Sequence, residues 1–376
     1  MSTEAPTKRT FHKFIAPIEG FIAKATGRFD SDKGYRKFFT RPHVLSQIYF
    51  QLSDLKSQRD LGEALCEDKQ VQDVLETTGV DHSNISRANE QRSFAIFRYI
   101  FHCLFPKALS CAEPALGLLA TLHKVKILDS TFLQCCASMA WATYKKTKNG
   151  LKAHLLLDLS LLPEKLVVTA GNGSDRDVLR QIIKRGVTYI FDRGYNCYEL
   201  FEQMSLAGAF FVTRLFDNAV YQIVETFYLD PEAILQGLIG DYRIRLGVPA
   251  TQVSVCFRMI VYWAPDGRIF RFLTNRFDLP ALVICDMYRY RWQIELFFRW
   301  IKQNLKVKRF LGRNKNAIFI QLYAALITFL LLQIFICKAE GKKHVNRWLL
   351  LRIKRTLFYS VPEAEVAAYS VAFDTS

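Results

Sequence analysis

The spacing of apolar positions predicts three kinds of structure along the chain: helices at the start, strands mixed with helices in the middle, and a β-rich stretch after them. In residues 11–25, Phe14 and Ile18 lie at helical spacing, and residues 44–55 and 61–66 continue this pattern. We therefore expect an all-helical first domain, followed by a proline-bounded linker at residues 106–114.

Residues 69–77 and 83–92 predict two helices joined by a turn at Gly79, which is the arrangement of a helix-turn-helix. Polar side chains of the second helix could then face DNA: Asn84, Ser86, Arg87, Asn89 and Arg92. Two helices joined by a glycine turn also occur in helical domains that bind no DNA, so both interpretations stay open at this point.

Short apolar runs in the middle of the chain predict three strands, a helix and a fourth strand. These elements are expected at residues 125–128, 151–157, 165–169, 175–185 and 187–191, with a polar, basic turn at residues 143–149. Asp129 directly follows the first strand, and Asp192 directly follows the fourth. An aspartate at a strand end often caps the next helix, so each one alone is a weak candidate for catalysis.

About a hundred residues separate Asp192 from the next candidate acid, which is more than one crossover connection needs. The pattern there predicts a helix, a strand and then a β-rich insertion, at residues 198–207, 210–214, 221–228, 241–246, 253–263 and 268–274, with a turn at residues 264–267.

The segment from Tyr288 to Lys302 carries the most specific pattern. In one continuous α-helix, Tyr288, Arg291, Glu295 and Lys302 would fall within an arc of roughly 60°. From residue 288 to residue 315 there are nine Lys or Arg and one acid, Glu295. A carboxylate kept in a stretch that favours polyanions indicates a metal ligand beside a phosphate backbone. The simpler alternative is a surface helix with a solvated basic face and local ion pairs.

Together these blocks resemble the DDE transposases of bacterial insertion sequences, and specifically the group named for its YREK signature. The resemblance rests on ILDST around Asp129, FDRGY around Asp192 and the segment from Tyr288 to Lys302, with WATYKKTKNGLKAHLLLDL at residues 141–159 as a further similar stretch. It implies an α/β ribonuclease-H-like core, a mixed sheet flanked by helices, with a β-rich insertion and an all-helical N-terminal domain that binds the element's terminal inverted repeats.

The resemblance also implies functional residues. Asp129, Asp192 and Glu295 would be the catalytic acids and would hold two Mg²⁺ ions about 3.5–4 Å apart, with Mn²⁺ able to substitute. Tyr288, Arg291 and Lys302 would bind DNA phosphates, and the further candidates for DNA contact are Asn84, Arg87, Arg299, Lys306 and Arg309. His154 and Asp158 compete as acid or metal residues, while Trp263 and Trp292 are candidates to stack an extruded base.

Composition agrees with DNA as the partner. The net charge is +16 and the isoelectric point about 9.4, which favours phosphate contacts, although membrane-surface proteins are just as basic. Residues 317–336 are apolar and long enough to span a bilayer, but Gln321 and Gln333 favour a buried core helix. Nine cysteines without a Cys-x2-Cys pair, and a start without an apolar leader, predict reduced thiols, no zinc site and a cytoplasmic, nucleoid-associated protein.

The expected domains are a helical DNA-binding domain at 1–115, the catalytic core at 116–214 and 279–340, the insertion at 215–278 and a basic C-terminal helix or tail at 341–376. The expected function is cutting and joining of transposon ends and target DNA, by a protein that is a homodimer in the end complex and uses no membrane. Two alternatives stay open: a ribonuclease-H-like nuclease or resolvase that does not join strands, and a basic membrane-associated protein.

Overall fold

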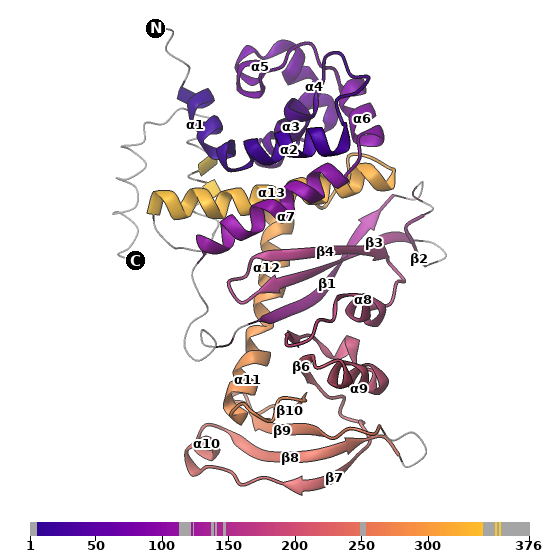
Figure 1. Ribbon diagram of the computed structural model, residues 1–376, viewed down its shortest axis with the longest axis vertical. Helices are drawn as coiled ribbons and strands as arrows, with labels where there is room; N and C mark the ends of the chain where they lie inside the picture. Colours follow the sequence, from indigo (N-terminus) through magenta and orange to yellow (C-terminus); the bar gives the residue numbers. More distant parts are fainter. Residues whose placement is uncertain are drawn as a thin grey trace. The chain divides into compact units, whose positions relative to one another are not determined.

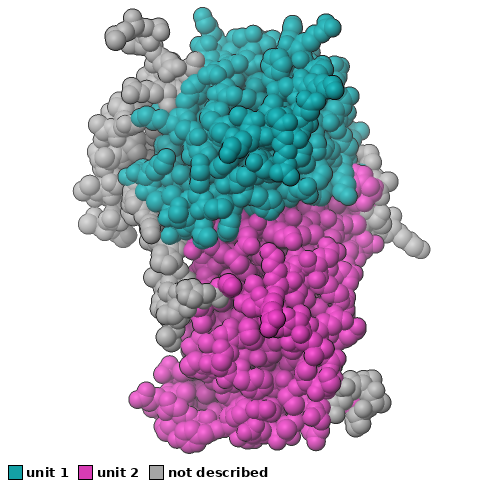
Figure 2. Space-filling view, viewed as in Figure 1, with its two compact units in different colours: residues 1–113, 134–140, 299–376 teal, residues 114–133, 141–298 magenta. Residues whose placement is uncertain are grey.

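The computed structural model describes residues 6–112, 122, 124–136, 139, 141–145, 148–248, 253–340, 350–351 and 353–354. The chain forms two compact units (Figure 2). Unit 1 comprises residues 1–113, 134–140 and 299–376, and unit 2 comprises residues 114–133 and 141–298. The expected second piece of the core, residues 279–340, is thus divided between the units after Phe298. Nearly all of the expected C-terminal tail lies outside the described residues.

Apart from residues 134–135 at the end of strand β1 (Val125–Cys135), the helices and strands described in unit 1 are all helices. Its N-terminal helices are α1 (Pro6–Ile15), η1 (Ala16–Ile18), α2 (Glu19–Phe29), α3 (Thr40–Leu52), α4 (Gln58–Glu67), α5 (Lys69–Leu75), α6 (His82–Gln91) and α7 (Ala95–Ser110). They pack with α13 (Lys315–Glu340), which lies against α1, α3, α6 and α7 (Figure 1). The predicted linker at 106–114 is therefore wrong at its start, because α7 continues through Pro106, whose ring is exposed.

Helix α13 contains the apolar segment that could be mistaken for a membrane span. Its length and hydropathy suffice to cross a bilayer, yet 94% of the most apolar window is buried inside the protein. Two polar side chains of α13 bind backbone groups within unit 1. Asn316 Nδ2 donates to the carbonyls of Asn89 and Arg92 at 2.8 Å, and Gln321 Nε2 donates to the carbonyl of Arg309 at 2.8 Å. These contacts favour a core helix, but one of the helical unit rather than of the catalytic sheet.

Two of the five polar residues expected to face DNA do not. Asn89 is buried and its side-chain oxygen lies 2.7 Å from Nε2 of the buried His43. Arg92 is also buried, and its guanidinium donates to the carbonyl of Phe38 at 2.7 Å. Both side chains are therefore part of the core of unit 1, and the expectation of DNA contact was wrong for them.

Unit 2 is built on a mixed ten-stranded sheet of order β2-β3-β1-β5-β6-β10-β9-β8-β7, with β4 paired to β3. Its strands are β1 (Val125–Cys135), β2 (Thr143–Lys145), β3 (Lys148–Asp158), β4 (Pro163–Ala170), β5 (Thr188–Ile190), β6 (Phe210–Arg214), β7 (Tyr221–Thr226), β8 (Leu238–Leu246), β9 (Phe257–Trp263) and β10 (Ile269–Thr274). The predicted order of elements is confirmed, except that the expected turn at 143–149 contains β2, which pairs with β3.

The first and fourth predicted strands are neighbours in this sheet. β1 and β5 are parallel, and Ile127 pairs with Ile190. Asp129 and Asp192 each lie two residues further along, so the shared register brings both acids side by side where β5 ends. β1 itself continues to Cys135, so the expectation that the first strand ends at Asp129 was wrong. A buried cluster that is rich in aromatic side chains packs these strands against α9 (Tyr198–Leu206). It includes the stacked rings of Phe201 and Phe211, whose centroids lie 4.6 Å apart.

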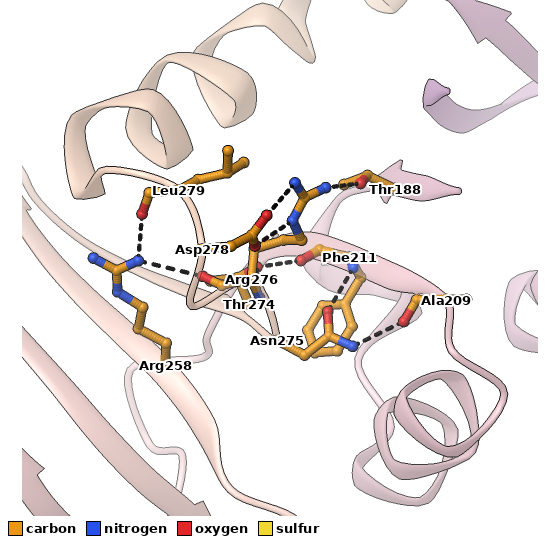
Figure 3. A network of polar contacts seen from close by, with 9 residues as sticks. All are labelled: Thr188, Ala209, Phe211, Arg258, Thr274, Asn275, Arg276, Asp278 and Leu279. Carbon is orange, nitrogen blue, oxygen red and sulfur yellow. Dashed lines mark hydrogen bonds and ion pairs between the residues drawn. The ribbon is translucent and has the colours of Figure 1, made fainter. Parts of the chain in front are cut away.

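A polar network joins the insertion to the core strands (Figure 3). Asn275, after β10, accepts from the amide of Phe211 at 2.9 Å and donates to the carbonyl of Ala209 at 2.8 Å. Arg276 donates to the Thr188 hydroxyl on β5 at 2.6 Å and pairs with Asp278 at 2.7 Å. The chain leaving the insertion is thereby anchored to β5 and β6 before it enters the last helices of the unit.

Those helices are α11 (Ala281–Tyr290) and α12 (Trp292–Asn304), and the break between them falls inside the YREK segment. The expectation of one continuous helix is therefore wrong, but the side chains of Tyr288, Arg291 and Glu295 still meet as the stripe predicted, because the Arg291 guanidinium contacts both of the others. Arg291 lies at the break, where its amide bonds to the carbonyl of Tyr288 and its own carbonyl accepts from the amide of Ile294, three residues apart in each case. Trp292, at the start of α12, is 48% exposed.

Candidate active site

Two of the three predicted acids, Asp129 on β1 and Asp192 just after β5, lie side by side, and local backbone groups orient each one. The Ser130 amide donates to Asp129 Oδ1 at 2.7 Å, and the Gly194 amide donates to Asp192 Oδ1 at 3.0 Å. A Cβ at Gly194 would come 3.0 Å from that same Asp192 oxygen, so only glycine fits there without displacing the carboxylate.

An arginine links the third predicted acid, Glu295, to Asp129. Arg291 Nη1 lies 3.3 Å from Asp129 Oδ2, and Arg291 Nη2 lies 2.6 Å from Glu295 Oε1. The side chains of Arg291 and Asp129 are 14% and 15% exposed, while that of Glu295 is 34% exposed. One guanidinium therefore bridges carboxylates from β1 and from the first turn of α12.

The acids influence one another electrostatically. Burial, and next the charge of Asp192, raise the pKa of Asp129 from 3.8 to about 7, against the opposing effect of Arg291. Burial also raises the pKa of Asp192, to which Asp175 and Glu295 contribute. When neighbouring negative charges raise the pKa of a carboxylate, a bound cation relieves their repulsion, and cation binding is favourable for this reason. Arg291 only partly offsets this repulsion, so a bound cation would favour the ionised form of the acids.

Two tyrosines line the same region. Tyr195 is fully buried, and burial together with the charges of Asp175, Asp129 and Asp192 raises its pKa well above 10.0. Tyr288 lies with its ring centroid 5.6 Å from the Arg291 guanidinium carbon and 5.0 Å from the ring of Phe272. Both hydroxyls therefore stay protonated near neutral pH and could act as hydrogen-bond donors.

The donor chemistry of this site fits Mg²⁺ or Mn²⁺. Asp129, Asp192 and Glu295 offer the hard oxygen ligands that these ions prefer, and their mutual repulsion favours a cation. Within the described part of the chain, however, no three His, Cys, Asp or Glu side chains already stand in an arrangement that holds a metal ion. Arg291 binds two of the three acids instead, so these side chains would have to exchange the guanidinium for a metal.

Sequence reasoning missed a group of residues beside Asp129. The Ser130 hydroxyl donates to Asp175 Oδ1 at 3.1 Å, and Lys152 Nζ pairs with Asp175 Oδ2 at 2.9 Å. His154, which was treated only as a competing candidate, lies with Nδ1 3.4 Å from Asp175 Oδ1. A signal was present, because Lys152 and His154 are polar residues two apart on one face of an otherwise apolar strand.

The other competing candidate, Asp158, has a structural position. It is 6% exposed at the end of β3, and its carboxylate accepts from the Leu162 amide at 2.8 Å in the turn that leads to β4. Its pKa is raised to about 6 by burial, and the charges that act on it are Lys126 and Glu164 rather than the predicted catalytic acids.

The predicted DNA-contact residues differ in availability. Asn84 and Arg87 on α6 are exposed, as are Arg299 and Arg309. Lys306 is the exception, because its Nζ contacts the Leu55 carbonyl and lies 4.5 Å from the Phe50 ring centre, and burial lowers its pKa to about 8. Lys306 is therefore better explained as a packing residue of unit 1.

Two further predicted residue sets have mixed positions. Lys302, in the last turn of α12, belongs to unit 1, and burial lowers its pKa. Both tryptophans named as stacking candidates are accessible: Trp263 is 57% exposed and Trp292 48%.

Comparison with known proteins identifies the family. The family model described as "Transposase DDE domain" matches residues 120–331. A protein of Sinorhizobium fredii named as a transposase is 36% identical over 56% of this chain and 60% of its own length, so this match spans less than two thirds of that relative. Proteins of Geobacillus stearothermophilus and Synechocystis, named as transposases for insertion sequence elements, are 26% and 25% identical over 75% and 70% of this chain, and 74% of their own lengths. The cryo-EM structure of the piggyBac transposase synaptic complex with hairpin DNA aligns with a TM-score of 0.44 and 11% identity, over 100% of this chain and 83% of that chain. The family match covers Asp129, Asp192 and Glu295 alike, and the chain therefore belongs to the family of DDE transposases.

Proposed function

We propose that the protein is a DNA transposase that cuts the ends of an insertion sequence and joins them to target DNA by metal-dependent phosphoryl transfer. One observation carries this proposal: Asp129 and Asp192 lie side by side on neighbouring strands, and Arg291 links Asp129 to Glu295. All three acids fall within the segment that matches the DDE family. The ribonuclease-H-like character of the sheet is part of the same proposal.

Asp129, Asp192 and Glu295 would hold two divalent ions, Mg²⁺ or Mn²⁺. When bound, such ions polarise the attacking oxygen and stabilise the charge that develops on the leaving oxygen. The chain itself would supply the arrangement: the amides of Ser130 and Gly194 orient the two aspartates, and both side chains are half-buried, which reduces the screening of their charge by water.

Arg291 and Tyr288 would bind the DNA phosphate next to the reacting bond. Arg291 offers a planar fork that matches a phosphate in two hydrogen bonds, and Tyr288 offers a protonated hydroxyl beside it. With Glu295 and Lys302 these residues make up the YREK signature, and on that basis we place the chain in the YREK group. Lys302 would add a point charge further along the backbone of the DNA.

Unit 1 would recognise the element's terminal inverted repeats. The exposed side chains of Asn84 and Arg87 on α6 support this proposal, as does the net charge of +16. Two chains would assemble on a pair of ends, and the protein would work in the bacterial cytosol at the nucleoid.

The test is an assay with the full-length protein, DNA that carries the element's own terminal sequences, and Mg²⁺. Nicking at the element ends followed by joining to a target plasmid supports the proposal, and both should disappear in Asp192→Ala while end binding persists. Cleavage without joining would favour a ribonuclease-H-like nuclease instead. Cleavage retained in Asp192→Ala would refute the assignment of the acids.

A further inference from the structure

The polar group beside Asp129 forms a connected chain of hydrogen bonds that the proposed chemistry does not use. Asp175, at the start of α8 (Asp175–Ile182), lies at its centre. One Asp175 oxygen accepts from the Ser130 hydroxyl on β1 at 3.1 Å, and the other pairs with Lys152 Nζ on β3 at 2.9 Å. Three elements of unit 2 therefore meet at this carboxylate.

The surroundings of Asp175 hold it in place. Lys152 Nζ also donates to the Gly173 carbonyl at 3.3 Å, one residue before the N-cap of α8. His154 is 1% exposed, and burial lowers its pKa to about 4, so it is neutral at pH 7. Its Nε2 lies 3.0 Å from Thr169 Oγ1 on β4, which fixes the imidazole plane against the Asp175 carboxylate.

The chain of contacts continues from Asp175 to the predicted catalytic acid. Ser130, whose hydroxyl binds Asp175, donates its backbone amide to Asp129 Oδ1 at 2.7 Å. With Oδ1 held in this way, Asp129 Oδ2 is the oxygen that faces Arg291. Ser130 therefore binds Asp175 through its side chain and Asp129 through its backbone.

We infer that Lys152, Asp175 and Ser130 form a positioning relay that sets the orientation of the Asp129 carboxylate for cation binding. None of the three would touch the cation or the DNA. They would act through the peptide that joins Asp129 to Ser130. This inference rests on the proposed function, because it assigns to these residues the support of a metal ligand. Partners of this kind commonly contribute 10- to 100-fold to metal affinity or activity, as an order of magnitude.

A purely structural role for the Lys152–Asp175 pair is the competing explanation, and the chain offers a matched control. Lys126 on β1 pairs with Glu164 on β4 at 2.5 Å, with side chains 19% and 28% exposed. The Lys152–Asp175 side chains are 24% and 22% exposed. Lys126 lies three residues from Asp129, so loss of this pair tests general damage to the strand without touching the relay.

The experiment measures Mn²⁺ binding to the full-length protein at pH 8 by electron paramagnetic resonance, and thermal unfolding of the same samples. Ser130→Ala and Lys152→Met should each weaken Mn²⁺ binding about tenfold. Ser130→Thr keeps the hydroxyl and should bind like wild type. Lys126→Met should lower the unfolding temperature about as much as Lys152→Met while its Mn²⁺ affinity stays at the wild-type value.

A double substitution shows whether the residues act in series. Asp175→Asn combined with Ser130→Ala should weaken Mn²⁺ binding no more than the stronger single change, because both interrupt the same path to Asp129. Wild-type affinity in Ser130→Ala and Lys152→Met, or equal weakening in Lys126→Met, would overturn the relay while the proposed function stands. A wild-type protein that binds no Mn²⁺ would instead reject the metal-dependent function and the relay together.

Discussion

Arg291 should compete with the metal ions that the acids are proposed to hold. Its guanidinium contacts Asp129 at 3.3 Å and Glu295 at 2.6 Å, and both oxygens are donors that a cation would need. Arg291→Ala removes this competitor. We therefore expect the metal-free variant to be less stable than wild type, and to bind Mn²⁺ more tightly.

The magnitude follows from the exposure of the two pairs. Asp129 and Arg291 are about as buried as each other, and breaking a fully buried pair costs about 3–5 kcal/mol. Partial exposure reduces this to about 1.5 kcal/mol, and the more exposed Glu295 pair adds about 0.5 kcal/mol, which gives a total of about 2 kcal/mol. A loss of about 2 kcal/mol lowers the unfolding temperature by about 4–8 °C. In wild type, Mn²⁺ must displace the arginine at a cost of the same free energy. Without the arginine this cost is absent, which corresponds to about 30-fold tighter Mn²⁺ binding.

Calorimetric titration of metal-free protein with Mn²⁺ at pH 8, combined with thermal unfolding, measures both effects. Arg276→Ala is the matched control, because Arg276 is also 14% exposed and lies in the same unit, but its ion pair is with Asp278 rather than with one of the predicted acids (Figure 3). It should lose stability without any change in Mn²⁺ affinity. If Arg291→Ala bound Mn²⁺ no better than wild type, the guanidinium would not occupy a position that the metal needs.

Four further results are expected. The pKa of Asp129, raised from 3.8 to about 7, stabilises the folded metal-free protein at low pH and loses that effect as the pH rises to 7, so the unfolding free energy should fall by up to about 1.4 kcal/mol per pH unit between pH 5 and 7. Asp129→Asn should make this slope smaller in thermal unfolding, and the remainder should come from Asp158 and Asp192, whose pKa values are also raised. Glu295→Gln should keep end binding in gel-shift assays but lose more than about a hundredfold in cleavage, because the amide lacks the charge that a hard cation requires. Replacing Asn84 and Arg87 by Ala in the full-length protein should weaken end binding and reduce the salt slope by about one, measured by fluorescence anisotropy; an unchanged slope would exclude a phosphate contact there. Lys302→Ala should slow strand joining in the plasmid assay and leave Mn²⁺ affinity unchanged.

The full-length protein is required for the DNA-binding test because of the position of α13. An N-terminal fragment that ends after α7 would lack the helix against which α3 and α7 pack. Loss of binding in such a fragment would report unfolding rather than the location of the recognition surface.

Elements with local signals could be predicted from the sequence. The apolar runs that lead to Asp129 and Asp192 are strands, and their parallel pairing brings the two acids together as expected. The turn at residues 264–267 could also be predicted, because it ends in a glycine. In the structure Gly267 adopts a φ of 82° in the hairpin between β9 and β10.

Features that depend on distant partners could not be predicted in the same way. No proline or glycine marks the helix break at Arg291; its neighbour Tyr290 donates to the Leu159 carbonyl at 2.9 Å, 131 residues away in the chain. Asn89 and Arg92 look like surface residues until their partners His43 and Phe38 are known. The same holds for Asp175, whose role depends on strands β1 and β3.

The packing of α13 against the N-terminal helices has a consequence for how the protein is made. Helices α1 to α7 leave the ribosome early, but the surface they bury is completed only after residue 340 has been synthesised. At a synthesis rate of about 5–20 residues per second, their apolar faces stay exposed for on the order of ten seconds or more before α13 is made. All of unit 2 is translated in that interval. A nascent chain therefore completes its sheet before its helical unit, and a prematurely terminated chain would present uncovered apolar helices to chaperones and proteases.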